Sequence, residues 1–396
     1  MNINYFIKKQ NLLIAKTSTD FIRKEYLAYL QESEKLIGLI GSRGVGKTTL
    51  LLQYLKLTSQ KYIYISADDA VFQDIRLYDL VDEAYSLGRK IVVIDEVHKC
   101  QNWARELKNI YDSFPDITIR ISGSSMINIL YEKYDLSRRL VLKSMPHLSF
   151  REFLSMQKAQ EFNKLELEDI LKNAESLSST LVFEHDDLYG LFKEYLEYGA
   201  YPFYIEGKKN FSTKLFNALD KVINEDIPSL NKIDFSHIII FKKLIFRLIE
   251  AGKPFQVNVA KLSRELGISE PTLYTYFEIL DKSKIITPLK KWSKKISKKP
   301  EKLVFSNTNI LYSYAKEFDK EVEIGTIRET FFVNCFDKIF YSDIGDFRVG
   351  EYIFEIGGKN KGFKQIKDIE NSFVVADIDY TVDNRKIPLW LFGFLY

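Results

Sequence analysis

Short apolar runs, each followed by small or acidic residues, recur through the first third of the chain. Four of them predict buried strands of a parallel sheet, and they cover residues 36–40, 62–66, 90–96 and 117–121. Segments between these runs predict helices, the first of them from Thr49 to Leu57. Because strands and helices alternate, the pattern predicts an α/β fold with a parallel central sheet.

The pattern changes after residue 147. From Leu148 to about Ile227 apolar residues recur at helical spacing, with little Gly or Pro before Gly199. This pattern predicts helices whose apolar faces form a core. A strongly apolar helix is predicted again from Phe241 to Ile249, and residues 259–277 then predict a helix, a turn and a second helix.

Composition limits what kind of protein this is. The 396 residues, 46% of them apolar, are enough for two to four domains, and the formal charge of +3 indicates no general attraction to nucleic acid. Cys100 and Cys335 are the only cysteines, too few for a disulfide framework or a zinc module, and both are expected to be buried or incidental thiols. The chain shows no signal-peptide pattern and no apolar stretch of membrane-spanning length, so we expect a cytoplasmic protein.

The first predicted strand leads into a complete Gly-x-x-x-x-Gly-Lys-Thr phosphate-binding loop. Its glycines let backbone N–H groups turn toward phosphates, Lys47 can reach the β- and γ-phosphate oxygens, and the Thr48 hydroxyl can bind Mg²⁺. The following helix adds the positive end of its dipole. The predicted nucleotide-binding residues are Gly41, Ser42, Arg43, Gly44, Val45, Gly46, Lys47, Thr48 and Thr49.

Two acids end the third predicted strand, as in a Walker B motif. Asp95 is predicted to hold Mg²⁺ directly or through water, and Glu96 to polarise the water that attacks the γ-phosphate. Ligands of such sheets lie beyond the carboxyl ends of the strands. Ser124, or alternatively Ser122, is therefore a candidate to sense the γ-phosphate or position the water, although a Ser-Gly-Ser turn is also ordinary after a strand.

An arginine pair follows at Arg138 and Arg139. A guanidinium placed against the developing γ-phosphate charge speeds phosphoryl transfer, and either arginine can supply one. A pair of solvated surface arginines is the alternative.

Taken together with residues 148–153 and 198–202, these motifs resemble the prokaryotic AAA+ ATPase family, and more narrowly its archaeal and bacterial branch related to signal-transduction NTPases. The resemblance spans roughly residues 10–235 and implies an AAA+ core with a helical lid that uses ATP and Mg²⁺. The family's arginine matches Arg139, but the family usually has Gly where this chain has Arg138. Which arginine acts on the γ-phosphate therefore stays open.

The helix-turn-helix segment resembles a winged helix. Gly267 suits its turn, Ser269 the N-cap and Pro271 the first turn of the second helix. That helix is predicted to offer Thr272, Thr275 and Tyr276 to a DNA groove, and residues 282–302 are rich in lysines that attract phosphates. Those lysines are Lys282, Lys284, Lys290, Lys291, Lys294, Lys295, Lys298, Lys299 and Lys302. A protein-interaction or regulatory winged helix is the alternative.

The C-terminal segment resembles a restriction-endonuclease-like domain. The resemblance assigns the divalent-metal carboxylates of that fold to Glu329, Asp346 and Glu355. The motif lysine belongs two residues after Glu355, where this chain has Gly357, and Lys359 is two residues too late for unchanged geometry. We therefore expect a degenerate nuclease fold in which these residues are vestigial.

The predicted architecture is an ATPase core (1–147), a helical lid (148–234), a winged helix (235–303) and a nuclease-like α/β domain (304–396). The leading hypothesis is a Mg²⁺-dependent ATPase whose nucleotide state acts through the winged helix and the nuclease-like domain, on double-stranded DNA. The alternatives are a slow ATP-dependent switch that acts on protein partners, and an active ATP-dependent nuclease. A homo-oligomer is left open, and no membrane partner is expected.

Overall fold

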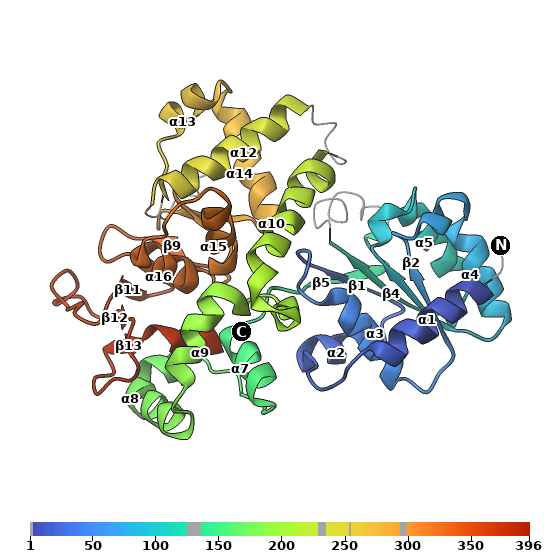
Figure 1. The fold of residues 1–396 in the computed structure, drawn as a ribbon, viewed down its shortest axis with the longest axis horizontal. Coiled ribbons are helices and arrows are strands. Elements are labelled where there is room, and N and C mark those ends of the chain that lie inside the picture. The colour runs from blue at the N-terminus through green and yellow to red at the C-terminus, as the bar shows by residue number, and fades with distance from the viewer. Residues whose placement is uncertain (1–2, 125–135, 229–234, 253–254, 294–298) are drawn as a thin grey trace. The chain divides into compact units, whose positions relative to one another are not determined.

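The structure is a computed structural model that describes residues 3–124, 136–228, 235–252, 255–293 and 299–396 (Figure 1). The chain forms two compact units, Met1–His147 and Leu148–Tyr396. The three segments predicted after residue 147 all lie in the second unit, and the boundaries between them stay predictions. No helix within the described ranges combines the length and the apolar character needed to cross a bilayer.

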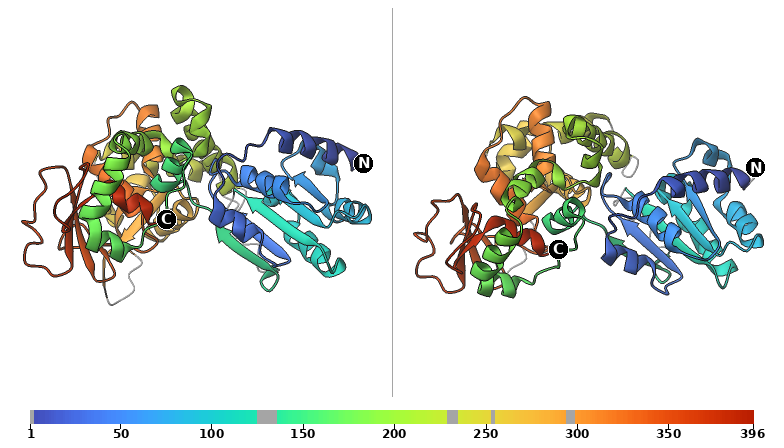
Figure 2. Two further views of the ribbon diagram at one scale, coloured as in Figure 1. Left: turned by 90° about the horizontal axis from the view of Figure 1, so that it is seen from below. Right: turned by 60° about the horizontal axis from the view of Figure 1, so that its bottom comes forward.

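A five-stranded sheet with the strand order β2-β3-β4-β1-β5 is the centre of the first unit (Figure 2). All four pairings are parallel, which confirms the parallel α/β fold predicted from the sequence. The strands are β1 (Leu36–Ile40), β2 (Tyr62–Ser66), β3 (Ile91–Asp95), β4 (Thr118–Gly123) and β5 (Leu140–Ser144). Strand β4 includes Ser122 and Gly123, which the sequence placed in the turn after it.

Helices surround this sheet. They are α1 (Asn4–Lys16), α2 (Lys24–Leu30), α3 (Lys47–Leu57), α4 (Leu77–Ser86) and α5 (Trp103–Ser113), with 3-10 turns η1 (Ala70–Asp74) and η2 (Val97–Lys99). Helix α1 runs along the β2 edge, where the Gln10 side-chain oxygen accepts the Tyr64 N–H at 2.8 Å. Helix α1 therefore satisfies a backbone donor that an edge strand would leave open.

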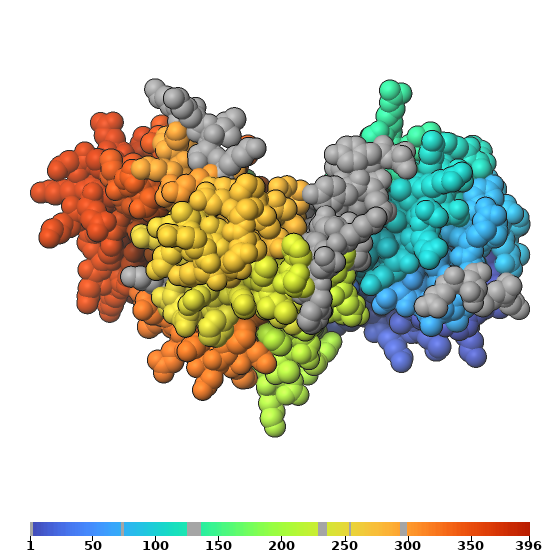
Figure 3. Space-filling model, turned by 90° about the horizontal axis from the view of Figure 1, so that it is seen from above, coloured from blue at the N-terminus to red at the C-terminus, as the bar shows by residue number. Residues whose placement is uncertain are grey.

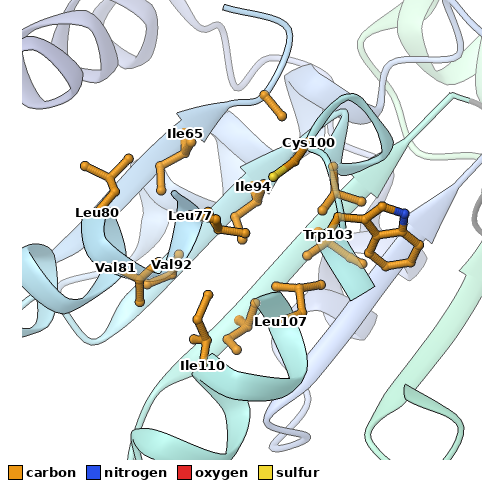
Figure 4. Packing of buried hydrophobic residues seen from close by; sticks show 14 of the residues in the cluster. Ile65, Leu77, Leu80, Val81, Val92, Ile94, Cys100, Trp103, Leu107 and Ile110 are labelled. Atoms are coloured by element: carbon orange, nitrogen blue, oxygen red, sulfur yellow. The ribbon is translucent and has the colours of Figure 1, made fainter. Parts of the chain in front are cut away.

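The core of the first unit lies between the sheet and helices α4 and α5 (Figure 4). On α5 the residues Trp103, Leu107 and Ile110 recur at the spacing of one helix face, and each is at most 1% exposed. They pack with Val92 and Ile94 of β3. This packing holds the carboxyl end of β3, and with it the two Walker B acids, in a fixed position.

The second unit begins with helices. These are α7 (Phe150–Lys158), α8 (Leu167–Glu184), α9 (Leu188–Glu194), a π-helical turn η4 (Tyr195–Gly199), 3-10 turns η5 (Pro202–Glu206) and η6 (Lys208–Asn210), α10 (Phe211–Lys221) and a second π turn η7 (Val222–Asp226). Ser149 caps α7 in a capping box with Glu152. A Cβ on Gly199 would lie 2.6 Å from ring carbons of Phe153 and Tyr195, so the close packing of η4 requires glycine there.

Three helices and a small antiparallel sheet follow. They are α12 (Phe235–Glu250), α13 (Val259–Leu266), α14 (Glu270–Lys282), β6 (Phe255–Gln256), β7 (Ile286–Lys290) and β8 (Pro300–Phe305), with strand order β6-β8-β7. Gly267 ends α13 at a φ of 69°, and Ser269 caps α14, as the sequence predicted. Helices α12 to α14 form an exposed face of this unit, yellow to orange in Figure 3. Assignment of these elements as a winged helix stays a prediction.

A second sheet completes the chain. Helices α15 (Thr308–Glu317) and α16 (Ile324–Val333) precede β9 (Phe340–Tyr341), β10 (Phe347–Val349), β11 (Tyr352–Gly357), β12 (Ser372–Ala376), β13 (Lys386–Pro388) and the 3-10 turn η8 (Leu389–Phe394). The sheet is antiparallel from β9 to β11 and parallel from β11 to β13. The apolar C-terminal residues form the β13 edge and the buried η8 turn, where Trp390 and Phe392 have no solvent exposure.

Candidate nucleotide site

The phosphate-binding loop joins β1 to α3. Gly44 and Gly46 have φ of 84° and 96°, a region that side chains disfavour. A Cβ on Gly41 would lie 2.3 Å from the Met145 carbonyl oxygen, so the loop also needs glycine where it crosses the end of β5. Gly46 is the N-cap of α3, so the N–H groups of the first helical turn open toward the loop.

Lys47 is the buried cation of this loop. Its residue is 5% exposed, and Nζ donates to the carbonyl oxygens of Gly41 and Ser42 at 2.8 and 2.9 Å. The chain therefore folds the lysine back onto its own loop, which keeps a positive charge beside the helix N-terminus. This arrangement fits a phosphate group, because an incoming anion meets an ammonium and several N–H donors at one place.

Asp95 is the most densely hydrogen-bonded acid of the site. Thr48 Oγ1 donates to its Oδ2 at 2.7 Å, the Tyr64 hydroxyl donates to the same oxygen at 2.8 Å, and Ser122 Oγ donates to Oδ1. The Thr48–Asp95 contact brings together the two oxygen ligands that the sequence predicted for Mg²⁺. Oxygen donors of this kind suit Mg²⁺, so these residues fit the ion.

Glu96 follows directly, and its backbone N–H donates to the same Ser122 hydroxyl at 3.3 Å, but its carboxylate has different partners. Ser124 donates to Glu96 Oε2 through its hydroxyl at 2.7 Å and its backbone N–H at 3.0 Å. His98 Nδ1 lies 3.4 Å from the same oxygen, and the His98 side chain is 2% exposed. The two serines at the end of β4 are thereby divided: Ser122, in the strand, holds the Asp95 carboxylate, and Ser124, just after it, holds the Glu96 carboxylate.

The electrostatic surroundings keep Glu96 ionised. Burial alone would raise its pKa, but the charge of Lys47, the neighbouring His98 and the hydrogen bonds from Ser124 outweigh burial and lower the pKa below its usual value. Glu96 also has a left-handed backbone conformation, with φ of 52°, which is uncommon for a residue other than glycine. Functional sites often contain such strained positions. His98 was not assigned a role from the sequence, because a lone histidine carries no pattern.

The described structure does not bring Arg139 to this cluster. Arg139 immediately precedes β5, whose first residue, Leu140, pairs with Leu36 at the start of β1. The phosphate-binding loop leaves the other end of β1, about 13 Å away at 3.3 Å per residue. Arg139 instead donates to both carboxylate oxygens of Asp112 at 3.0 and 3.1 Å, while Arg138 is exposed.

The predicted nuclease-like carboxylates lie together in the second unit, but the lysine that pairs with Glu355 is not the predicted Lys359. Asp346 hydrogen-bonds the backbone on both sides of Glu355, through Phe354 and Ile356. Burial raises the pKa of both Glu329 and Glu355, and the charge of Asp346 raises it further. Lys359 is exposed and does not contact Glu355. Lys361 forms the ion pair with Glu355 instead.

The predicted DNA-contacting residues are only partly exposed. Tyr276 is 3% exposed and packs on Phe241 with ring centroids 4.4 Å apart, so the prediction that it faces a groove is wrong. A tyrosine three to four residues from the apolar Leu273 and Leu280 lies on the core face of α14. Thr275 is exposed, and Thr272 is half-buried with its hydroxyl beside that of Ser269.

The lysines of residues 282–302 also differ from the prediction. Lys282 pairs with Glu278 at 2.6 Å and Lys291 with Asp343 at 2.6 Å. Lys302 is 8% exposed, so it cannot belong to a DNA-facing surface. Lys284, Lys290 and Lys299 are exposed, while Lys294, Lys295 and Lys298 lie outside the described residues.

Two family models match the chain. Residues 33–154 match one described as an AAA domain, and residues 189–321 match a domain of unknown function, DUF8612. The chain is 29% identical over 310 residues to the uncharacterized protein MJ1637 of Methanocaldococcus jannaschii, a match that covers 72% of this chain and 64% of that protein. The match thus spans less than two thirds of that relative's length.

Two solved structures of Thermotoga maritima RuvB, each with one substitution, align with 82% of this chain and with 96% and 97% of their own. Their sequence identities are 13% and 15%, and their TM-scores are 0.27 and 0.30, too low to establish a shared overall fold. The family match and the geometry of the loop and sheet agree: the first unit carries an AAA domain with the α/β fold of P-loop NTPases.

Proposed function

We propose that the chain is a Mg²⁺-dependent ATPase that converts ATP and water to ADP and phosphate. The observation that carries the proposal is the division of the two Walker B acids. Asp95 shares a hydrogen bond with Thr48 at the loop, whereas the neighbouring Glu96 is held separately by Ser124. In this proposal one acid binds the metal and the other receives a proton.

The loop residues bind the nucleotide in this proposal. Backbone N–H groups from Gly44 to Thr48 and the α3 N-terminus surround the β- and γ-phosphates, and Lys47 exchanges its carbonyl partners for phosphate oxygens. Thr48 and Asp95 hold Mg²⁺, which when bound neutralises charge that develops on the phosphate oxygens. The adenine preference rests on the family resemblance, and no guanine-reading Asn-Lys-x-Asp occurs in the sequence.

Glu96 acts on the attacking water. Its lowered pKa keeps it a carboxylate at neutral pH, so it can orient the water and accept its proton. Ser124 fixes one carboxylate oxygen with two hydrogen bonds, which leaves the other oxygen for the water. Ser124 is therefore proposed as a positioning residue for Glu96.

Arg139 has a different place in this proposal. Because Arg139 lies beside the start of β1 and the phosphate-binding loop leaves the other end of that strand, a contact with a γ-phosphate would have to be made to a nucleotide bound by a second copy of the chain. Arg138, which is exposed beside it, is the alternative for that contact. A homo-oligomer follows from this part of the proposal.

We further propose that the second unit couples nucleotide state to double-stranded DNA. The exposed Lys284 and Lys290 support this part of the proposal, since lysines attract phosphates whatever the base sequence. One observation favours the alternative, a slow switch that acts on a protein partner. The exposed residues of α14 include Glu270 and Glu278, and the negative charge of acids on a helix that enters a DNA groove repels the DNA phosphates.

Steady-state ATP hydrolysis with and without duplex DNA tests the proposal. Lys47→Ala should abolish nucleotide binding, and Glu96→Gln should retain binding but lose turnover. Lys61→Ala and Glu83→Gln, at exposed positions of the same unit, are the matched controls and should behave as the parent. Turnover that survives Glu96→Gln would refute the catalytic assignment. Tight ATP binding with negligible turnover, unaffected by DNA, would favour the switch.

A further inference from the structure

The three carboxylates of the nuclease-like segment each have a protein donor. Lys361 Nζ pairs with Glu355 Oε1, and the Gln365 amide, with its nitrogen toward the carboxylate, donates to the two Glu355 oxygens at 2.7 and 2.9 Å. Asp346 Oδ2 accepts the Ile356 N–H at 2.7 Å. Glu355 itself is 1% exposed, so these donors replace water around it.

Lys361 reaches Glu355 across the position where the motif expects lysine. A Cβ on Gly357 would lie 2.5–2.7 Å from the Cβ, Cγ and Cδ atoms of Lys361. A side chain at residue 357 and the present course of Lys361 therefore exclude each other. Gly357 therefore stands where the motif has lysine because Lys361, four residues later in the chain, occupies the space of a side chain at that position.

The third carboxylate is paired with a cation from another sheet. Lys302 of β8 donates to Glu329 Oε2 of α16 at 3.1 Å, with the two side chains 10% and 18% exposed. Strand β8 pairs with β6 and β7, whereas Glu329, Asp346 and Glu355 belong to the C-terminal α/β segment. The Lys302–Glu329 pair thus joins two structural segments of the second unit.

Other contacts join the same two segments at the β7 end of the β7–β8 hairpin. The Trp292 N–H donates to the Tyr341 carbonyl at 3.0 Å, and the Trp292 ring lies 5.1 Å from that of Phe340. The guanidinium of Arg348 lies 4.5 Å from the centroid of the Trp292 ring. The hairpin is therefore docked on strands β9 and β10 by backbone, aromatic and charged contacts.

These residues do not fit a divalent cation. Such ions need several carboxylate oxygens free of other donors, and here two lysines, a glutamine and a backbone N–H already pair with four of the six oxygens, including both of Glu355. Within the described part of the chain no three His, Cys, Asp or Glu residues are placed to hold a metal. An acidic group that lacks a metal needs other positive charge to be stable, and Lys302 and Lys361 supply it.

We propose that Lys302 and Lys361 take the place of a metal in this carboxylate cluster, and that the cluster clamps the β7–β8 hairpin to the C-terminal sheet. The hairpin and the C-terminal sheet then move as one body. Because the cluster has lysines where an active nuclease would bind its metal, we do not propose nuclease activity for this chain. This inference concerns the second unit alone and does not depend on ATP hydrolysis.

Two lysine pairs in the full-length chain test the clamp. Lys361→Met should lower the Tm of the second unit by roughly 5 °C, whereas Lys359→Met, at the exposed motif-like lysine, should change it by less than about 1 °C. Lys302→Met should raise amide exchange in residues 286–293 by roughly threefold, and Lys290→Met on the same hairpin should not. Lys361→Gln and Lys302→Gln, which keep a donor, serve if a Met variant does not fold. Equal effects of Lys361→Met and Lys359→Met would refute the replacement of a metal by Lys361, and equal effects of Lys302→Met and Lys290→Met would refute the clamp.

A Mn²⁺ titration without nucleotide tests the absence of a metal. Because the first unit also has oxygen ligands, the parent is compared with Glu355→Gln at each Mn²⁺ concentration. The expected result is the same Mn²⁺-dependent change in Tm for both proteins. A Tm increase in the parent that Glu355→Gln removes would show a metal at the cluster and would overturn the proposal.

Discussion

Ser124→Ala offers the sharpest test of how the two Walker B acids divide their roles. Ser124 Oγ lies 2.7 Å from Glu96 Oε2, and the Glu96 side chain is 19% exposed. A hydrogen bond to a charged, largely buried group contributes about 1.5–3 kcal/mol. The Ser124 backbone N–H still donates at 3.0 Å after the substitution, so the lower end applies. About 1.4 kcal/mol corresponds to a roughly tenfold lower kcat.

Ser122→Ala is the matched comparison, because the Ser122 hydroxyl donates to the Asp95 carboxylate and meets Glu96 only at the backbone, where it accepts the Glu96 N–H at 3.3 Å. Asp95 keeps its hydrogen bonds from Thr48 and Tyr64, so we expect a rise of only about threefold to tenfold in the Mg²⁺ concentration for half-maximal activity. Ser124→Ala should leave that concentration unchanged. The assay is steady-state hydrolysis at saturating ATP over a Mg²⁺ series. If Ser124→Ala shifts Mg²⁺ dependence and leaves kcat intact, the assignment is refuted.

The pH dependence of Ser124→Ala checks the same reasoning independently. Hydrogen bonds from Ser124 favour the charged form of Glu96 and help to lower its pKa. The substitution removes the hydroxyl bond and keeps the backbone one, which raises that pKa. A base that must be ionised then loses activity at a higher pH as the solution is acidified. We expect the acidic limb of the kcat profile to move toward neutrality in Ser124→Ala but not in Ser122→Ala.

Two further predictions concern the scaffold of the first unit. Arg120 is 2% exposed and its guanidinium donates to four backbone carbonyls at 2.6–2.9 Å. Arg120→Met should lower the free energy of unfolding, measured by urea denaturation, by about 3 kcal/mol or more, since each buried acceptor left unpaired costs about 1–3 kcal/mol. Arg105→Met, at an exposed position, should change it little. Gly41→Ala places a Cβ 2.3 Å from the Met145 carbonyl and should weaken binding of a fluorescent ATP analogue at least about tenfold, whereas Gly190→Ala, with open space around it, should not.

The strands that the sequence predicted share one property: both faces of each are largely covered. A strand buried on both sides is a continuous apolar run, and β1 and β3 are buried at every residue. Strand β5 escaped prediction because none of its residues is fully buried, with Val141 41% exposed, and because Lys143 interrupts the apolar run; the other edge strand, β2, has a buried centre and was predicted. Because β5 was not predicted, the position of Arg139 was not predicted either: only the pairing of β5 with β1 shows that this arginine lies beside the start of β1, away from the phosphate-binding loop.

The partners of side chains were less predictable than the helices and strands, because a loop can bring a residue other than the one in the linear motif to the site. The linear motif offered only Lys359, two residues too late, as a partner of Glu355, but the turn after β11 brings Lys361 back over Gly357. His98 shows the same limitation in the first unit. Its place beside Glu96 depends on the left-handed backbone at Glu96 and the short η2 turn, neither of which has a sequence signal strong enough to predict.

The distribution of lysines bears on what the second unit recognises. Each lysine that pairs with an acid on the protein contributes less counterion release when DNA binds, so a count of lysines along the sequence overstates the electrostatic part of binding. Lys282, Lys291 and Lys302 are paired in this way, and the last of them is buried. Because Tyr276 belongs to the core, α14 presents little that could read base edges. Any DNA contact by this unit is therefore expected to be made to phosphates through the hairpin and to show little preference for base sequence.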